Sequence, residues 1–328
     1  NAQTMEPCLI RILALAMVLS AASSAGAQPS GALPRTSDGK PDLQGTWTNS
    51  SITLLERSNP SLPLTLNAEQ VTRMETSRAQ ENAADAAPTT TQEAPQAGIA
   101  IVPANLFWAD RGGKVGVVNG EPRSSWIVDP ANGKMPVSDA GRKRISSILA
   151  KRSEEGPEGM NPADRCLVAS RGSGGPPMLN NLYNNNYRIV QTPGYVMIEV
   201  EMMHDVRIIR MEQSQKPGAL KQWLGDSIGR WDGDTLVVTT RNWKRLHGDY
   251  EPVFLSENAV VTERFTRSGK DEITYAFTVD DPGFYTQAWK GEMVFTTSSG
   301  PLYEYACHEG NYALHNILQG ARIRESRK

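Results

Sequence analysis

The chain has 328 residues, of which 21% are charged and 39% hydrophobic, and its formal net charge at pH 7 is −2. So small a net charge provides no field for holding nucleic acid or an anionic membrane surface, and we expect no nucleic-acid partner. The length exceeds what one large domain needs to build a core that is stable without disulfide bonds.

The first 27 residues have the pattern of a secretory signal peptide. An apolar run covers residues 9–22, and Ala25, Gly26 and Ala27 form the small-residue site that a signal peptidase cleaves. The run is shorter than the ~20 residues of a membrane-spanning helix. We therefore predict cleavage before Gln28, export to the periplasm or the cell exterior, and no membrane span in residues 28–328.

Two cysteines, Cys166 and Cys307, remain after the predicted cleavage, because Cys8 lies in the signal. Export places both in an oxidising compartment, which favours a disulfide between them. Such a bond would close a loop of roughly 140 residues and add several kcal/mol in the chain-entropy model. The alternative is two buried free thiols, since a bridge needs Cα atoms within roughly 7 Å of each other.

Residues 55–160 are predicted to be irregular and partly helical. A polar surface helix is expected over residues 67–85, where Asn67 is a suitable N-cap and Gln70 completes a capping box. A second helix is expected over residues 138–152, because isoleucine and leucine recur there at helical spacing. This part of the chain therefore supplies peripheral helices rather than the main core.

From residue 187 onward the hydrophobic pattern has a period of two, which is typical of half-buried strands. A hairpin is expected over residues 188–211 with its turn at 192–194, and a second tight turn at 232–234. Later strands are expected at residues 235–240, 260–267, 272–279, 289–296 and 302–307. We predict a single, mainly β domain over residues 28–328: a curled antiparallel sheet or barrel with a few peripheral helices.

The Gly-Thr-Trp triplet at residues 45–47 resembles the Gly-x-Trp motif of lipocalins and related calycin barrels. That resemblance implies a lipocalin-like barrel closed at one end by Trp47, beneath an arginine near the last strand, a place that Arg322 or Arg324 could fill. The chain also resembles a broad family of uncharacterised exported bacterial proteins, through residues 38–47, 183–187 and 305–312. This second resemblance implies no particular activity.

Two glutamates alternate with apolar residues on the strand expected before residue 203. Glu199 and Glu201 would share one face about 7 Å apart, a separation near that of the carboxylate pairs in glycoside hydrolases. The alternative is a solvated outer face, which is ordinary for an antiparallel strand. His204 and Asp205 follow directly, and a histidine beside a carboxylate can be an oriented general base. A solvated turn histidine is the competing interpretation.

A second group of chemically able side chains follows the last expected strand. His308 and Glu309 come directly after Cys307, and Asn311 and Tyr312 come next. If Cys166 and Cys307 are bridged, this group and the first would meet at one end of the barrel, where barrels usually bind ligands. We predict six catalytic candidates: Glu199, Glu201, His204, Asp205, His308 and Glu309.

Substrate-binding candidates lie around the same end of the predicted barrel. Tyrosines flank a run of amides at residues 183–187, an arrangement suited to a sugar-like ligand and also common in structural turns. The residues proposed to contact substrate are Tyr183, Asn185, Asn186, Tyr187, Arg207, Asn311 and Tyr312.

The sequence supports two functional hypotheses. The first is an exported, cofactor-independent acid/base enzyme, a hydrolase, lyase or isomerase, that acts on a small organic or sugar-like substrate. The second is a lipocalin-like binding protein without catalysis. A metal site built from His204, His308 and a glutamate has no supporting ligand spacing, and no nucleophile elbow of the lipase type occurs. We therefore predict no cofactor and no metal.

Overall fold

The computed structural model describes residues 33–86, 110, 112–151, 156, 159–169, 172–218, 220–244 and 252–327. The predicted signal peptide lies outside these residues. The described residues belong to one compact unit, Leu33–Lys328. Their helices include none that is long and apolar enough to cross a membrane.

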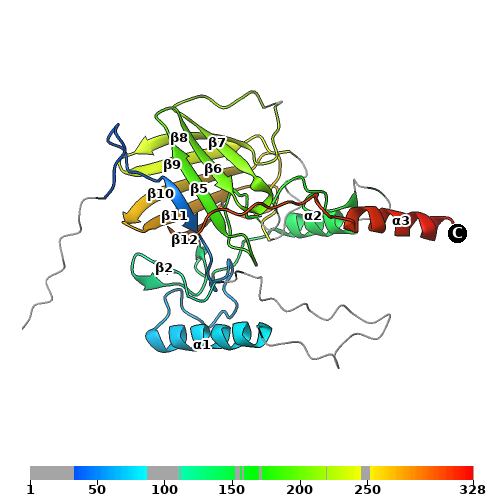
Figure 1. Ribbon diagram of the computed structural model, residues 1–328, viewed down its shortest axis with the longest axis horizontal. Coiled ribbons are helices and arrows are strands. Elements are labelled where there is room, and N and C mark those ends of the chain that lie inside the picture. The colour runs from blue at the N-terminus through cyan, green and yellow to red at the C-terminus, as the bar shows by residue number, and fades with distance from the viewer. Residues whose placement is uncertain are drawn as a thin grey trace, which may run out of the picture. The chain divides into compact units, whose positions relative to one another are not determined.

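The core is a closed β-barrel (Figure 1). One ten-stranded sheet runs in the order β1-β5-β6-β7-β8-β9-β10-β11-β12-β4, and β1 also pairs with β12, which closes a ring of nine strands and leaves β4 outside it. The ring comprises β1 (Gly45–Thr48), β5 (Asn186–Gln191), β6 (Tyr195–Val200), β7 (Val206–Met211), β8 (Asp226–Asp232), β9 (Thr235–Arg241), β10 (Val260–Gly269), β11 (Glu272–Asp280) and β12 (Trp289–Thr297). The predicted barrel fold is confirmed.

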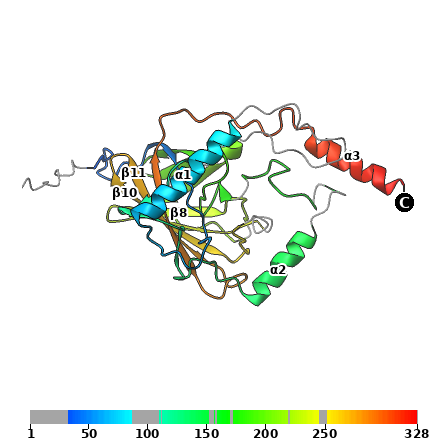
Figure 2. The ribbon, with the colours of Figure 1, turned by 90° about the horizontal axis from the view of Figure 1, so that it is seen from below.

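Three helices lie outside the ring of strands (Figure 2), a number that refers to the described residues. α1 (Ala68–Asp85) begins at Asn67, whose side chain accepts from Gln70 N while the Gln70 side chain accepts from Asn67 N, so the predicted capping box is confirmed. α2 (Asp139–Ala150) begins after Ser138, within the predicted range. α3 (Ala313–Glu325) was not predicted.

The segment between α1 and α2 adds a few short strands to the outside of the barrel. β2 (Val117–Val118) and β3 (Glu121–Pro122) form a small hairpin, and β4 (Ile127–Asp129) pairs with β12. Beside this hairpin, Val71 and Met74 of α1 pack on a small cluster of buried side chains. The cluster comprises Ile52, Leu66 and Val115. The amphipathic face of α1 is therefore buried against the segments before and after it.

Aromatic side chains fill the interior of the barrel. Tyr275 lies between Phe265 and Phe295, with ring centroids 5.0 and 5.2 Å away, and all three rings are fully buried. Trp47 is also fully buried, and the guanidinium of Arg267 lies 4.7 Å from its ring centroid. The arginine over Trp47 therefore comes from β10, and the expectation that Arg322 or Arg324 of α3 fills this place is wrong.

The pairing of β7 with β8 differs from every other pairing among the described strands of the ring, because it is parallel. It extends over only three residue pairs, from Ile209↔Ser227 to Met211↔Gly229. A parallel neighbour needs a long crossover, which here runs over residues 212–225; its described residues, 212–218 and 220–225, form no helix and no strand beyond an isolated bridge between Gln222 and Trp243. Before Ile209 the two strands are no longer paired, so the barrel wall opens between them.

Residues 302–307, which we call the C-terminal strap, do not form the predicted strand. A strand needs a neighbour that takes up its backbone hydrogen bonds, and the strap instead donates backbone N–H groups to side chains. Tyr303 N donates to Glu201 and Tyr305 N donates to His204. Two N–H groups of the strap therefore bond a carboxylate and an imidazole rather than a neighbouring strand.

Candidate functional site

The opening between β7 and β8 forms a groove with a volume of about 580 Å³. Residues 205–208 and 210 line one side, and the crossover lines the other through Lys216 and residues 221–225. Asp226 and Ser227 of β8 continue that lining, and Leu167 and Lys244 complete it. We call this cavity the β7–β8 groove; its volume lies within the range of small-molecule sites, about 300 to 1,000 Å³.

Asp205 lies at the edge of the groove, at the start of β7. The backbone N–H of Ala169 donates to Asp205 Oδ2 at 2.7 Å, and this is the hydrogen bond that the described residues make to its carboxylate. Gly174 passes so close that a Cβ there would lie 3.1 Å from Oδ2 and 3.3 Å from Leu224 Cδ2. Burial raises the pKa of Asp205 to about 6, and the Ala169 N–H only partly offsets this effect.

His204 lies beside Asp205 but receives its hydrogen bond from another segment. Tyr305 N donates to His204 Nδ1 at 3.3 Å, so in the neutral ring the proton is on Nε2. A histidine in this tautomer offers a donor at Nε2, whereas a general base needs a free lone pair there. The predicted role of His204 as a base therefore does not fit this arrangement, and Asp205 is the better proton acceptor.

Glu199 and Glu201 do not share a face of the sheet. Glu199 is half-buried within β6, opposite Arg188 and Val206, whereas the strand ends at Val200 and Glu201 has helical backbone angles that turn it into the protein. Glu201 is 2% exposed and holds two partners, Asn186 Nδ2 at 2.7 Å and Tyr303 N at 3.2 Å. The expected carboxylate pair is thus absent, and Glu201 fastens the C-terminal strap.

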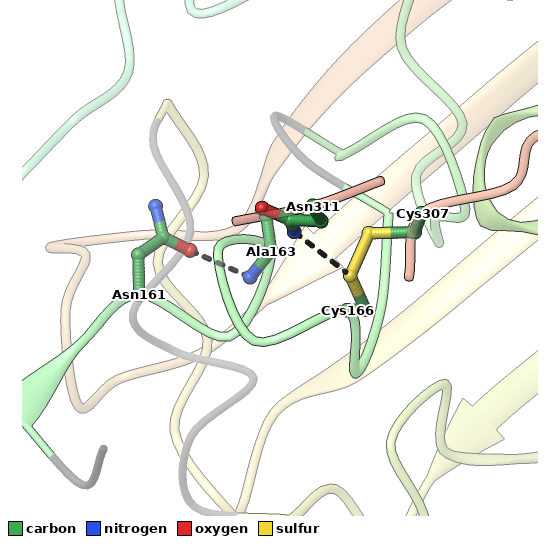
Figure 3. Close-up of a disulfide and its surroundings, with 5 residues drawn as sticks. All are labelled: Asn161, Ala163, Cys166, Cys307 and Asn311. Atoms are coloured by element: carbon green, nitrogen blue, oxygen red, sulfur yellow. Dashed lines mark hydrogen bonds between the residues drawn. A yellow bond between two sulfur atoms is a disulfide. The ribbon is translucent and has the colours of Figure 1, made fainter. Parts of the chain in front are cut away.

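A disulfide joins Cys166 to Cys307, with their Cα atoms 5.8 Å apart, as predicted (Figure 3). Asn311 Nδ2 donates to Cys166 Sγ at 3.8 Å. The bond links the strap, which reaches His204, to the segment before Ala169, which reaches Asp205. His204 and Asp205, the predicted histidine–aspartate pair, are therefore each hydrogen-bonded by a segment, and the same disulfide connects these two segments.

The other residues predicted to follow the disulfide are not drawn into the groove. His308, Glu309 and Tyr312 are exposed, and no hydrogen bond joins them to His204 or Asp205 in the part of the chain that the structure describes. Tyr183 does reach the strap: its ring is stacked on Tyr305 with centroids 6.5 Å apart. Burial, followed by the Tyr183 hydrogen bond, raises the pKa of Tyr305 to about 12.

Two predicted substrate contacts have structural roles instead. Asn185 is fully buried, accepts from Asn181 N at 2.6 Å and donates to the Asp110 carbonyl at 2.7 Å. Tyr187 is fully buried, donates to the Ser173 carbonyl at 3.1 Å and accepts from Asn49 Nδ2 at 3.1 Å. Neither side chain has a polar atom left for a substrate, because the turn and the barrel interior satisfy both.

Arg207, another predicted substrate contact, lines the groove from inside the barrel. Its guanidinium forms a fork with Glu263, at 3.0 Å and 2.5 Å, and Tyr275 Oη donates to the same carboxylate at 2.8 Å. The side chains of Arg207 and Glu263 are 1% and 0% exposed. This bidentate pair closes the floor of the groove rather than offering a free charge to a ligand.

No sequence pattern indicated the opposite wall of the groove. Lys216, Lys221, Gln222 and Trp223 lie on the crossover, which carries no periodic pattern, and Lys244 follows β9. The one sequence feature that could have indicated this wall is a tryptophan within a loop that carries lysines, just before a strand. The parallel pairing of β7 with β8 brings this loop to Asp205.

Among the described residues, no three histidine, cysteine, aspartate or glutamate side chains lie close enough together to hold a metal ion. The pairing of His204 with His308 and a glutamate, considered from the sequence, therefore has no counterpart there. No family model, no curated protein and no solved structure matches the chain.

Proposed function

We propose that this protein is an exported, cofactor-independent acid/base enzyme that acts on a small organic molecule in the β7–β8 groove, with Asp205 as the general base. The observation that carries the proposal is the position of Asp205: a carboxylate with a pKa near 6, at the edge of a cavity of about 580 Å³. Such a group is ionised at neutral pH and still basic enough to accept a proton from a substrate.

The same observation supports reactions that begin with removal of a proton by a base. Hydrolysis through an activated water, elimination and isomerisation each need one well-placed base, and each is consistent with a hydrolase, lyase or isomerase. The disulfide supports export, because such bonds persist in oxidising compartments. The packed aromatic interior argues against a lipocalin mode of binding, in which the ligand lies inside the barrel.

The proposal is tested by incubating the purified protein with a small-molecule extract of a bacterial culture and following each compound by mass spectrometry. We expect at least one compound to be converted, at a rate that falls as the pH is lowered through 6, and Asp205→Asn to reduce this rate at least 100-fold. Asp280→Asn, an exposed aspartate at the end of β11, is the matched control and leaves the rate unchanged. Equal conversion by Asp205→Asn, or binding without conversion, contradicts the proposal.

A further inference from the structure

The charged groups at the floor of the groove already have partners. Asp226 accepts from Arg210 Nη2 at 3.0 Å through both oxygens and from the backbone N–H of Lys216 at 2.7 Å. Ser227 Oγ is hydrogen-bonded to Thr240 Oγ1 at 2.8 Å, and Arg207 is paired with Glu263. These groups fix the shape of the floor and have little capacity left for a ligand.

Apart from the carboxylate of Asp205, the lining groups that lack partners are the ammonium groups of the crossover. Lys216 and Lys221 make no ion pair within the described residues. An ammonium group can only donate. A molecule that satisfies both must present acceptor atoms, and two ammonium groups favour one that carries negative charge.

The remaining lining is apolar or aromatic. Leu167, Val206, Ile208 and Leu224 supply aliphatic surface, and Trp223 supplies a ring. Lys244 Nζ lies 4.6 Å from the centroid of the Trp223 ring, so a third cation lies at the same wall. Sugar hydroxyls need donors and acceptors all round the ring, which aliphatic walls do not provide, whereas a flat unsaturated ring packs well against them.

We propose that the substrate of the groove is a small planar organic anion, such as an aryl carboxylate, whose negative group meets Lys216 and Lys221 while its ring packs beside Trp223. That the bound molecule is a substrate rests on the proposed function. The binding itself follows from the donors and the apolar wall. It replaces the sugar-like ligand expected from residues 183–187 with a ligand that has few hydroxyl groups.

The binding is measured by isothermal titration calorimetry of the full chain with three probes: naphthalene-2-carboxylate, 2-naphthylmethanol and glucuronate. We expect the naphthoate to bind at least tenfold more tightly than the neutral alcohol, because a charge-assisted contact is about twice as strong as a neutral one. Glucuronate, which has the charge but not the flat ring, should bind more weakly than the naphthoate. Equal affinities for naphthoate and alcohol, tighter binding of glucuronate, or no binding of any probe overturns the inference.

Variants locate the binding in the groove. Lys221→Gln should weaken naphthoate binding about tenfold and leave the affinity for the alcohol unchanged, since it removes one charge and keeps a polar side chain that is only one atom shorter. Trp223→Leu should weaken both probes. Lys143→Gln, which changes an exposed lysine of α2, is the matched control with no effect on either probe. Loss of affinity in the control, or none in Lys221→Gln, contradicts the assignment to this site.

Asp205→Asn separates this inference from the proposed function. It removes a negative charge from the edge of the groove, so naphthoate should bind at least as tightly as to the wild type, even though conversion is lost. Turnover retained with tight binding would overturn the catalytic role and leave the ligand class standing. Turnover lost in Asp205→Asn without any preference for anions would overturn the ligand class alone.

Discussion

Asp205 is a carboxyl group that loses water on folding, and this loss has a measurable cost. Its pKa rises from 3.8 to about 6 because of burial, so the folded state favours the protonated form. Stability from this group is therefore fully present below pH 3.8 and is lost as the pH rises through 6. A site with an ionised Asp205 at neutral pH carries a destabilised carboxylate, as an activated base should.

Asp205→Asn should therefore stabilise the protein at pH 8 relative to the wild type and have little effect at pH 4. We expect a difference of about 1–2 kcal/mol in the free energy of unfolding, less than the ~3 kcal/mol that two pKa units give for a fully buried group, because the groove is open to water. Urea unfolding of both proteins at the two pH values measures it. The same difference at pH 4 and pH 8 would show that burial of the carboxylate is not its cause.

The ion pair between Arg207 and Glu263 shows how burial changes the effect of one substitution. Both side chains are almost fully buried, so Glu263→Gln leaves a guanidinium without its counter-charge inside the barrel. We expect a loss of about 3–5 kcal/mol in the free energy of unfolding. Asp232→Asn breaks a pair with Arg264 in which the side chains are 54% and 45% exposed, and should cost less than about 1 kcal/mol. Similar losses in both variants would contradict this ranking.

At the scale of the strand, the neighbouring strands β11 and β12 are tightly packed at Phe277 and Gly291. Phe277 is opposite Gly291 in the register, and a Cβ at residue 291 would lie 2.3 Å from Phe277 Cζ. The ring occupies that space and meets Trp289 edge-on, with centroids 5.7 Å apart. Glycine is therefore required at residue 291 by the neighbouring ring and not by its own backbone angles.

Gly291→Ala should destabilise the protein by about 2–4 kcal/mol, since the Phe277 ring must leave its rotamer or the strands must separate. Gly300→Ala is the matched control, because a Cβ there meets no atom within 4 Å. Thermal unfolding of both variants measures the effect. Combining Gly291→Ala with Phe277→Leu should cost less than the sum of the two single changes, and simple additivity would show that the predicted clash does not occur.

At the scale of the whole molecule, the sequence predicted the barrel better than it predicted the site. β5, β6, β10, β11 and β12 were predicted because each alternates between the interior and the outside, whereas β8, whose residues do not alternate, was marked only by the turn at 232–234. The alternation misplaced Glu201, because β6 ends at Val200, one residue before it. The groove could not be found, since it depends on which strands become neighbours, and the parallel pairing of β7 with β8 leaves no mark on either strand.

The disulfide joins two segments that are far apart in the chain. These segments bond the adjacent residues His204 and Asp205. Cys307 closes the C-terminal strap, whose Tyr303 and Tyr305 N–H groups bond Glu201 and His204. Cys166 lies three residues before Ala169, whose N–H bonds Asp205. The ladder between β10 and β11, by contrast, is regular from Val260↔Asp280 to Arg267↔Ile273, and neither strand carries a cysteine of this bond.

Replacing Cys166 and Cys307 together by serine should therefore loosen the strap before it affects the barrel. We expect amide hydrogen exchange at Tyr303, Tyr305 and Ala169 to become at least tenfold faster, while the amides of β10 and β11 keep their protection, because local opening needs only the bonds to three side chains to break. Any conversion that depends on Asp205 should fall in parallel. Hydrogen exchange followed by mass spectrometry, on native protein well below its unfolding temperature, measures both regions at once. Uniformly faster exchange would mean that the disulfide stabilises the whole barrel through the unfolded chain. Unchanged exchange at Tyr303 and Tyr305 would mean that Glu201 and His204 hold the strap without it.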